Sequence, residues 1–261
     1  MSIFVQTSVN GMIRICIYAS LLIFCSSSAT AQPFDTARVS QGNGWITQQV
    51  VGNHSILSEG MFKDGVREGT WTSYWQTGFP KMIENYFHGK KHGLFIQTGE
   101  DGFIEQLTTY ANDLLNGPTR RYNKGAFILE ETYYRNGLKN GSYIKWYENG
   151  QKQEQAIFTD GVRNGLSLYF YENGEKAAEY PYKMGKLEGR VTTWYANQQI
   201  NETGAYINDE QSGNWEEYYE NGKLKAAGAY EHGEKQGTWK EYAEQGNKPE
   251  IKRYNKGQLI P

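Results

Sequence analysis

Aromatic residues and glycines alternate with polar residues in a pattern that repeats every 24 residues along most of the chain. A lead glycine or aspartate recurs at this spacing, at Gly65, Gly89, Asp113, Gly137, Gly161, Gly185, Asp209, Gly233 and Gly257. A second glycine follows four residues later in each unit, from Gly69 to Gly237. A fixed period of this length is typical of repeat architectures. The pattern predicts an array over residues 61–261, with eight full units and the start of a ninth.

Each unit contains two runs of strand-favouring residues with a turn signal between them. In the unit that begins at Gly65 the runs cover about residues 69–76 and 79–87, and Thr77-Gly78 separates them. Later units have Asn-Gly at this place, as in Asn149-Gly150, and this pair is a strong hairpin signal because both residues accept positive φ. Gly or Pro interrupts every window of helical length, so no helix is expected.

Strands that follow one another with short links pair antiparallel, and no segment remains for a second layer. The sequence therefore predicts an all-β fold: an elongated single-layer antiparallel β-meander built of 24-residue β-hairpin repeats. Residues 32–60 contain one alternating run, Trp45 to Val51, before the regular units begin. We expect this stretch to be a degenerate N-terminal repeat that acts as a cap, since terminal repeats are usually atypical.

Aromatic side chains recur at the same positions of successive units. The column 21 residues after the lead position contains Tyr86, Tyr110, Tyr134, Phe158, Tyr182, Tyr206, Tyr230 and Tyr254. Three further columns lie six, nine and ten residues after the lead position and begin at Trp71, Tyr74 and Trp75. Neighbouring positions of a strand point to opposite faces, so the array should have aromatic rings on both faces. Cross-strand aromatic pairs would then replace a conventional core.

The N-terminal segment has the composition of an export signal. Arg14 precedes a short apolar run over residues 15–24, and Ala29-Thr30-Ala31 resembles a cleavage site. These features predict a signal peptide over residues 1–31, with cleavage near Ala31 and a periplasmic, outer-envelope or extracellular location. An uncleaved membrane anchor is the alternative, although the run is short for a span. Both cysteines, Cys16 and Cys25, lie in this segment, so the mature chain would have none.

Composition and motifs argue against several classes of function. The chain has 27 basic and 29 acidic residues, so no basic excess points to nucleic acid, and a membrane would not be bound through a basic patch. No catalytic motif is present, and the repeated glutamates of the turns do not form a distinct acid–base pair. We expect no enzyme activity, no cofactor and no metal site. His88 and His92 are interpreted as turn residues, since their spacing is not that of metal ligands.

Two segments carry a family resemblance. Residues 213–222 read Gly-Asn-Trp-Glu-Glu-Tyr-Tyr-Glu-Asn-Gly, and residues 141–150 read Gly-Ser-Tyr-Ile-Lys-Trp-Tyr-Glu-Asn-Gly. This unit resembles the MORN repeat, and most of all the variant repeats of the YwqK-type antitoxin family, over about residues 60–261. The resemblance implies a sheet of hairpins that contacts proteins or membranes, with no catalytic residues. It also implies that the partner could be a toxin.

The favoured hypothesis is an exported, non-catalytic scaffold for protein–protein interaction. Stacked aromatic residues beside polar ones suit protein interfaces, so the predicted contact residues are Tyr147, Tyr171, Tyr195 and Tyr219. The alternative is recognition of an envelope glycan, a small cation or a lipid, because aromatic hairpin repeats also form cages that hold cations.

Overall fold

The computed structural model describes residues 34–52 and 55–261, and every regular element in these ranges is a β-strand. The first strands are β1 (Asp35–Gly42), β2 (Trp45–Gly52), β3 (Ser55–Lys63), β4 (Val66–Tyr74), β5 (Pro80–Phe87), β6 (Lys90–Lys91), β7 (Gly93–Thr98), β8 (Ile104–Ala111), β9 (Leu114–Tyr122), β10 (Ile128–Arg135) and β11 (Leu138–Trp146). They continue with β12 (Lys152–Thr159), β13 (Val162–Arg163), β14 (Gly165–Phe170), β15 (Lys176–Lys183), β16 (Lys186–Leu187), β17 (Gly189–Trp194), β18 (Ile200–Ile207), β19 (Glu210–Tyr218), β20 (Leu224–Glu231), β21 (Glu234–Glu241), β22 (Glu250–Asn255) and β23 (Gln258–Ile260).

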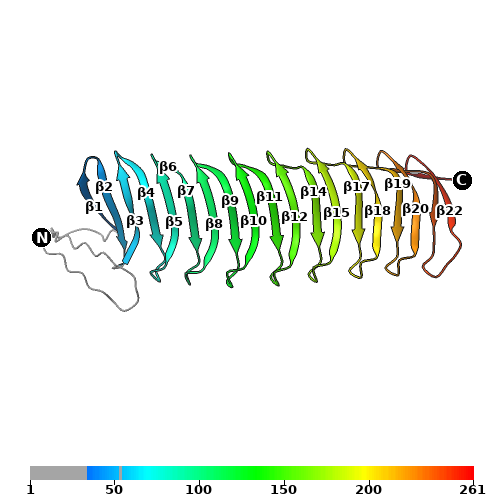
Figure 1. Ribbon diagram of the computed structural model, residues 1–261, viewed down its shortest axis with the longest axis horizontal. Helices are drawn as coiled ribbons and strands as arrows, with labels where there is room; N and C mark the ends of the chain where they lie inside the picture. The colour runs from blue at the N-terminus through cyan, green and yellow to red at the C-terminus, as the bar shows by residue number, and fades with distance from the viewer. Residues whose placement is uncertain (1–33, 53–54) are drawn as a thin grey trace. The chain divides into compact units, whose positions relative to one another are not determined.

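These strands form one 23-stranded antiparallel sheet in which neighbours in the sequence are neighbours in space (Figure 1). The two-residue strands β6, β13 and β16 pair with the strand before them and lead directly into β7, β14 and β17. The described strands lie in a single layer (Figure 1). The predicted all-β meander of hairpins is therefore confirmed.

Two kinds of turn alternate along the sheet. The first turn of each unit has only two residues, both with positive φ: Asp64 has φ 49° and Gly65 has φ 84°. The second turn of the first unit is closed by hydrogen bonds from Trp75 N to Phe79 O and from Gly78 N to Trp75 O, both 2.9 Å long. Asn-Gly, Asp-Gly and His-Gly suit the first kind because these residues accept the left-handed conformation.

The strand bounds differ from the prediction for a reason that lies in the first turn. The segment from the lead glycine to the second glycine was expected to be a connection, whereas β4 already begins at Val66. The predicted strand 69–76 also ends earlier, at Tyr74, because Trp75 opens the second turn. The column that begins at Trp75 therefore lies in the turns.

The core of the sheet is one row of side chains on one face, six residues after each lead position. We call it the core row: Trp71, Phe95, Thr119, Tyr143, Ser167, Val191, Trp215 and Trp239. All are buried except Thr119, which is half-buried, and Trp239 is 0% exposed. The register places Trp71 opposite Glu84 and Gly69 opposite Tyr86, so the column that begins at Tyr86 lies on the same face.

Rings of these two columns pack edge to face. Trp215 contacts Tyr206 and Tyr230 with centroids 5.3 and 5.8 Å apart, and Trp239 contacts Tyr230 at 5.1 Å. Edge-to-face pairs of this kind stabilise by about 0.5–1.5 kcal/mol beyond burial. Cross-strand aromatic packing thus replaces a second layer, as the sequence predicts.

The N-terminal predictions are only partly within the described residues. The predicted signal peptide, residues 1–31, lies outside them. Within the predicted cap, β1, β2 and most of β3 pair in chain order and join β4 in the same sheet. Its boundary at residue 60 stays a prediction.

Candidate binding site at the second turns

The second turns of the units lie in a row along one long side of the sheet, at the ends of the strands. We call this side the second-turn edge. The turn row is the set of residues that open these turns: Trp75, Gly99, Asn123, Tyr147, Tyr171, Tyr195, Tyr219 and Ala243. It includes all four tyrosines that the sequence predicts as partner contacts. The structure places these tyrosines side by side along the edge and leaves each half-buried.

Their hydroxyl groups are used within the sheet. The hydroxyl of Tyr147 donates to the carbonyl oxygen of Phe170 at 2.8 Å, which links one unit to the next. The same bond recurs from Tyr171 to Trp194 at 2.6 Å, from Tyr195 to Tyr218 at 2.9 Å and from Tyr219 to Tyr242 at 2.7 Å. In the first unit Trp75 Nε1 donates to Thr98 O at 3.0 Å. A partner would therefore contact the rings of these tyrosines rather than their hydroxyl groups, and that role stays a prediction.

The turn chemistry explains why the row is so regular. Asn149 Oδ1 accepts from Gln151 N at 2.9 Å, and Gly150, with φ 84°, supplies the left-handed residue. The Asn149 amide donates in turn to Glu172 O, at 2.8 Å, in the following turn. Asn-Gly thus closes its own turn and ties it to the next one.

The turn row is interrupted at two successive units. Gly99 has no side chain, and the carboxamide of Asn123 folds back to accept from Gly125 N at 2.9 Å and Phe127 N at 3.0 Å. Each ring of the turn row donates to the carbonyl oxygen 23 residues later, so the equivalent acceptors for Gly99 and Asn123 are Tyr122 O and Trp146 O. Among the described residues, no side chain donates to either of these two oxygens.

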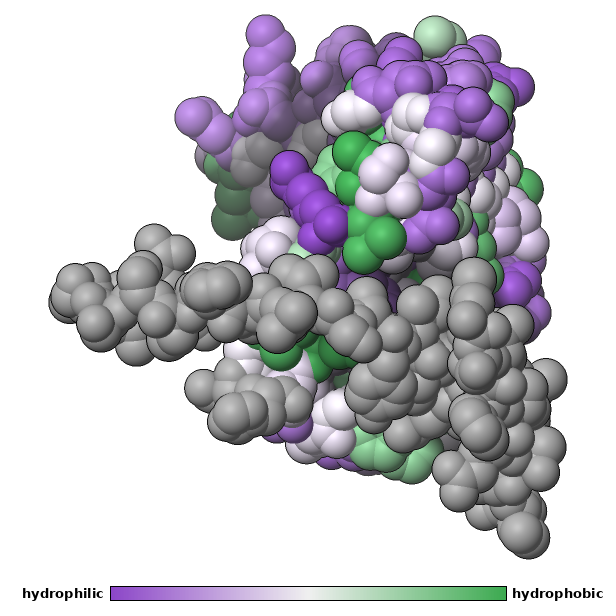
Figure 2. All heavy atoms as spheres, turned by 90° about the vertical axis from the view of Figure 1, so that its left-hand side faces the viewer, coloured by the Kyte–Doolittle hydropathy of each residue, from purple (hydrophilic) through white to green (hydrophobic). Residues whose placement is uncertain are grey.

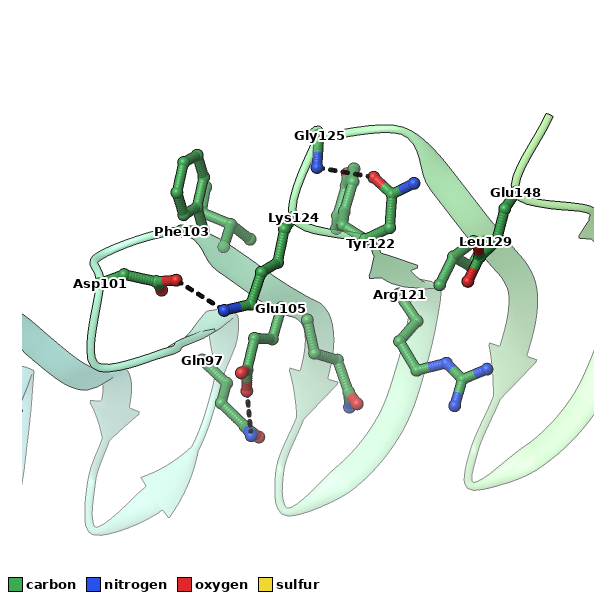
Figure 3. A pocket seen from close by; sticks show the side chains of 13 residues that line it. Gln97, Asp101, Phe103, Glu105, Arg121, Tyr122, Lys124, Gly125, Leu129 and Glu148 are labelled. Carbon is green, nitrogen blue, oxygen red and sulfur yellow. Dashed lines mark hydrogen bonds and ion pairs between the residues drawn. The ribbon is translucent and has the colours of Figure 1, made fainter. Parts of the chain in front are cut away.

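Two adjoining hollows lie at the interruption. One of about 420 Å³ is lined by Trp75, Lys81, Met82, Gln97, Gly99, Glu100 and Glu105. The other, of about 670 Å³, is lined by thirteen residues that include Phe103, Tyr122, Asn123, Leu129 and Glu148 (Figure 3). Gln97 and Glu105 line both hollows, so the two lie next to each other, and we call them together the depression.

Side chains of both signs surround the depression. Lys124 reaches across from the third unit to Asp101 with its Nζ 3.1 Å from Oδ2, and Gln97 Nε2 donates to Glu105 Oε2 at 3.1 Å (Figure 3). The hydrogen bond from Lys124 lowers the pKa of Asp101. Arg121 pairs loosely with Glu130, at 3.6 Å. The depression therefore does not select strongly for one charge.

Exposed phenylalanines mark the same part of the edge. The residue that follows the second turn is Phe79, Phe103 and Phe127 in the first three units, and these side chains are 49%, 49% and 64% exposed. In the next four units the same position holds Gln151, Glu175, Gln199 and Lys223. Large exposed apolar side chains that occur together are typical of interaction sites.

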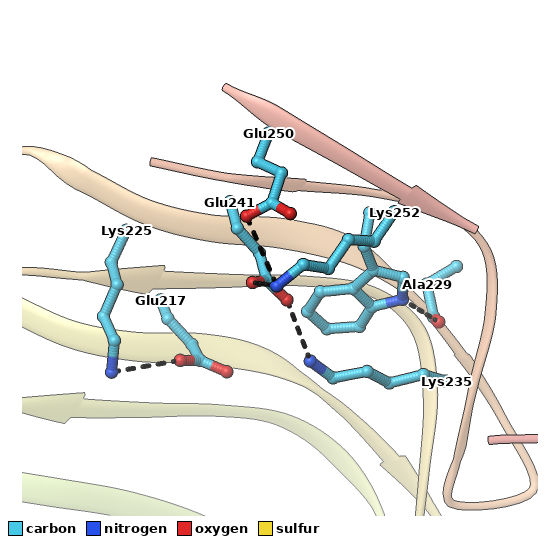
Figure 4. A network of polar contacts seen from close by, with 8 residues as sticks. Glu217, Lys225, Ala229, Lys235, Glu241, Glu250 and Lys252 are labelled. Atoms are coloured by element: carbon cyan, nitrogen blue, oxygen red, sulfur yellow. Dashed lines mark hydrogen bonds and ion pairs between the residues drawn. The ribbon is translucent and has the colours of Figure 1, made fainter. Parts of the chain in front are cut away.

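The core row is not such a surface, because the chain covers it with its own cations. The guanidinium of Arg67 lies 4.5 Å from the ring centroid of Trp71, and Lys235 Nζ lies 4.0 Å from that of Trp239. Figure 4 shows Lys235 and Lys252 converging on Glu241, with Nζ–oxygen distances of 3.8 and 2.5 Å. These internal contacts occupy the ring faces that a cation-binding cage would need.

Other chemistry is limited within the described residues. They contain no group of three His, Cys, Asp or Glu side chains that could hold a metal ion, and no helix long and apolar enough to cross a membrane. His88, with φ 50°, forms a first turn with Gly89, which confirms the interpretation of this histidine as a turn residue. On the side that Figure 2 shows, hydrophilic residues predominate and apolar ones are scattered.

This depression is not predicted above from the sequence, although two signals of it are visible there. Gly99 and Asn123 break a column that is otherwise aromatic as far as Tyr219, and three phenylalanines follow turns where other units have polar residues. The meaning of the break depends on the hydrogen bonds between units, which the sequence does not reveal.

Comparison with known proteins supports the repeat assignment. A search of curated proteins gives no match. Residues 139–160, 163–184 and 211–232 match the MORN repeat variant, and the matches are in phase with the 24-residue unit. Repeats of this family are generally non-catalytic and serve as scaffolds for protein or membrane interaction. Three stretches of the chain are therefore similar to the MORN repeat variant, and they lie in a longer array of hairpins with the same period.

Proposed function

We propose that the chain is a non-catalytic scaffold that binds another protein through the second-turn edge of its first three units. The observation that carries this proposal is the coincidence of three exposed phenylalanines with the interruption of the turn row. A protein partner fits because aromatic residues around a small depression supply the anchors on which protein interfaces depend. A membrane surface fits less well, because this edge carries no excess of basic residues.

The proposal extends to where the partner is met. The apolar run over residues 15–24 and the Ala-Thr-Ala segment support export, so the partner would be an envelope or extracellular protein. The resemblance to YwqK-type repeats supports a toxin as one class of partner. Cell fractionation with N-terminal sequencing tests export: we expect a mature chain that begins at Gln32, and an intact N-terminus in the cytoplasm would contradict it.

The binding proposal is tested by affinity capture with two matched variants. The full chain is immobilised, exposed to envelope and culture-medium extracts in moderate salt, and the retained molecules are identified by mass spectrometry. The combined Phe79→Gln, Phe103→Gln and Phe127→Gln variant installs the residue found at position 151, so the fold should be preserved. We expect it to lose a protein that the unmodified chain retains in stoichiometric amount.

The control replaces three exposed apolar side chains on the opposite edge. Leu114, Leu138 and Val162 follow first turns and are 49%, 50% and 44% exposed. The combined Leu114→Gln, Leu138→Gln and Val162→Gln variant should retain the partner. Equal loss in both variants, or retention of only lipid or glycan by the unmodified chain, would contradict the proposal.

A further inference from the structure

Resting on the proposed function, we infer that the depression at Gly99 and Asn123 receives two aromatic side chains from an extended segment of the partner, three residues apart. Each ring would take the place that the turn row leaves open. A tyrosine hydroxyl or tryptophan N–H on each would donate to the carbonyl oxygen of Tyr122 or Trp146.

The repeat itself shows which group fits. At five of the seven steps between units, an aromatic ring lies at the turn and its O–H or N–H donates to a carbonyl oxygen of the next unit. The five distances lie between 2.6 and 3.0 Å. The backbone that surrounds the two open positions has the same turns and register, so the same chemistry suits them.

The position at Gly99 can accept a ring without movement of the backbone. Gly99 is buried beneath side chains: a Cβ built there would come closest to Asp101 Oδ1 and Glu105 Oε1, at 2.8 and 3.0 Å, and these atoms are the far ends of flexible side chains. Both carboxylates have surface partners, Lys124 and Gln97, and can turn toward water. Gly99 also lacks a positive φ, so a side chain at this position is not strained.

The spacing of the two positions selects the conformation of the partner. Successive second turns are two strands apart, roughly 9–10 Å. A polyproline II segment rises about 3.1 Å per residue with three residues per turn, so side chains three apart lie on one side at about 9.3 Å. A β-strand places same-side neighbours only about 6.6 Å apart. The partner segment is therefore of the type Tyr-x-x-Tyr or Trp-x-x-Tyr, in a polyproline II conformation.

The exposed phenylalanines would border the bound segment. Phe103 lines the larger hollow, and Phe79 packs against Gly102 of the next turn. Proline rings pack well on aromatic side chains, and a preformed polyproline II segment loses little entropy on binding. The mixed charges of Lys124, Asp101 and Glu105 favour a segment without strong net charge.

The test is a fluorescence-anisotropy titration of the full chain with a labelled peptide, Gly-Tyr-Pro-Pro-Tyr-Gly. We expect saturable binding. Loss of both hydroxyls in the corresponding Phe peptide should weaken it by roughly fivefold for each hydrogen bond. Removal of one proline from the spacer should weaken it on the order of tenfold, because only one ring can then be seated.

Two variants of the chain make the test specific. Gly99→Tyr fills one open position with the chain's own ring and should weaken binding at least about tenfold. Ala243→Tyr adds the same ring to the turn row at a distant, exposed position and should leave binding unchanged. Both variants are expected to fold, since each introduces the residue that other units already have.

The outcomes separate this inference from the proposed function. If the peptide does not bind, or if Gly99→Tyr binds it as well as the unmodified chain does, the inference is wrong. If a protein is nevertheless captured through Phe79, Phe103 and Phe127, the scaffold proposal stands without it. If neither is observed, both fail.

Discussion

At the scale of single residues, each tryptophan of the core row is matched by a glycine eleven residues earlier, on the preceding strand. The pairs are Gly60 with Trp71, Gly204 with Trp215 and Gly228 with Trp239. A Cβ at Gly204 would lie 2.1 Å from the ring of Trp215, so the indole occupies the space of the missing side chain. Where the core row has the smaller Val191, the preceding strand has Tyr180. A large residue at one of these two paired positions is thus accompanied by a small one at the other, which keeps the space between the strands filled.

The exchange of volume can be tested by transplanting one pair onto another. Gly204→Tyr should destabilise by about 1–3 kcal/mol through overpacking. Trp215→Val should cost roughly 2–4 kcal/mol through the cavity it leaves. The double variant recreates the Tyr180–Val191 pair, so its loss of unfolding free energy should be smaller than the sum by at least about 1 kcal/mol. Denaturant unfolding measures all three, and additive losses would show that the two sites are independent.

The indole N–H gives these positions a second function. The register shifts between Thr203 and Ala205, which pair with Glu216 and Ser212, so the extra residues of this bulge lie on β19. Trp215 Nε1 donates to Ala205 O at 3.2 Å. The equivalent bonds from Trp71 and Trp239 are 2.9 and 3.1 Å long. The tryptophan thus satisfies a carbonyl at each bulge while it fills the gap above the glycine.

A pair of glutamates predicts how stability depends on pH. Glu202 lies directly opposite Glu217, among Tyr180, Tyr206 and Tyr230. Burial raises the pKa of Glu202 from its ordinary value of 4.5, and Glu217 raises it further, whereas Lys225 lowers it. The folded state therefore binds this proton more strongly than the unfolded chain does, and stability falls as the pH rises from the ordinary pKa through the raised one.

Glu202→Gln should remove this dependence. The variant should be more stable than the unmodified chain at pH 7 by up to about 1 kcal/mol, the scale of a cross-strand pair of like charges. The difference should fade below the ordinary pKa, where Glu202 is protonated in both states. Unfolding free energies measured at several pH values between 4 and 7 test this. A variant that is less stable at neutral pH would show that the carboxylate is stabilising.

At the scale of elements, the two-residue first turns keep the same backbone conformation even where their sequence does not favour it. Residue 184 is the exception among turn starts that are otherwise Asn, Asp, His or Lys: Met184 has φ 50° and is 78% exposed. The flanking strands determine the turn, because Tyr182 pairs with Leu187 and Lys183 pairs with Lys186 on either side of it. The left-handed conformation of an ordinary residue costs roughly 1–2 kcal/mol, which asparagine partly avoids.

Met184→Asn should therefore stabilise the chain by about 1 kcal/mol. The reciprocal change, Asn136→Met, should destabilise it by a similar amount, since both residues start a first turn that ends in glycine. Thermal or denaturant unfolding of the two variants provides the comparison. A loss of stability in Met184→Asn would mean that contacts of the methionine side chain outweigh its backbone conformation.

At the scale of the whole array, the sequence predicts the features that follow from the 24-residue period. It does not predict the side-chain contacts that link one unit to the next. The 24-residue spacing, the Asn-Gly pairs and the lack of helical windows were enough for the sheet and its order. The first turns were predicted too long, because the second glycine of each unit, four residues after the lead position, suggested a loop. In the first unit this glycine, Gly69, lies within β4 and has φ 70°. The use of the Tyr147 hydroxyl could not be predicted, since its acceptor is a backbone oxygen 23 residues away.

In such an array each unit contacts only its neighbours, so stability is distributed unevenly along it. Val191, Trp215, Ala226 and Trp239 form a buried cluster with Tyr180, Tyr206, Tyr230 and Tyr254. The third unit has a weaker core, because its core-row residue is Thr119, only half-buried, with a buried Oγ1 that lacks a partner among the described residues. The same unit contains Asn123, where the turn row is interrupted. The proposed binding site thus includes the unit whose core-row residue is the least buried.

Hydrogen exchange should reveal this difference in local stability along the array, and a single substitution in the third unit should reduce the difference. We expect amides of β8–β10 to exchange faster than those of β19–β21, since local opening needs to break fewer contacts there. Thr119→Tyr recreates the pairing of Thr132 with Tyr143 in the next unit, and should slow exchange in β8–β10 by roughly tenfold as an aromatic ring is added to the core row. Thr238→Tyr, an exposed position in the last full unit, is the control and should leave these strands unchanged. Uniform protection along the array, or equal effects of the two variants, would show that the units unfold together and that the interruption has no energetic consequence.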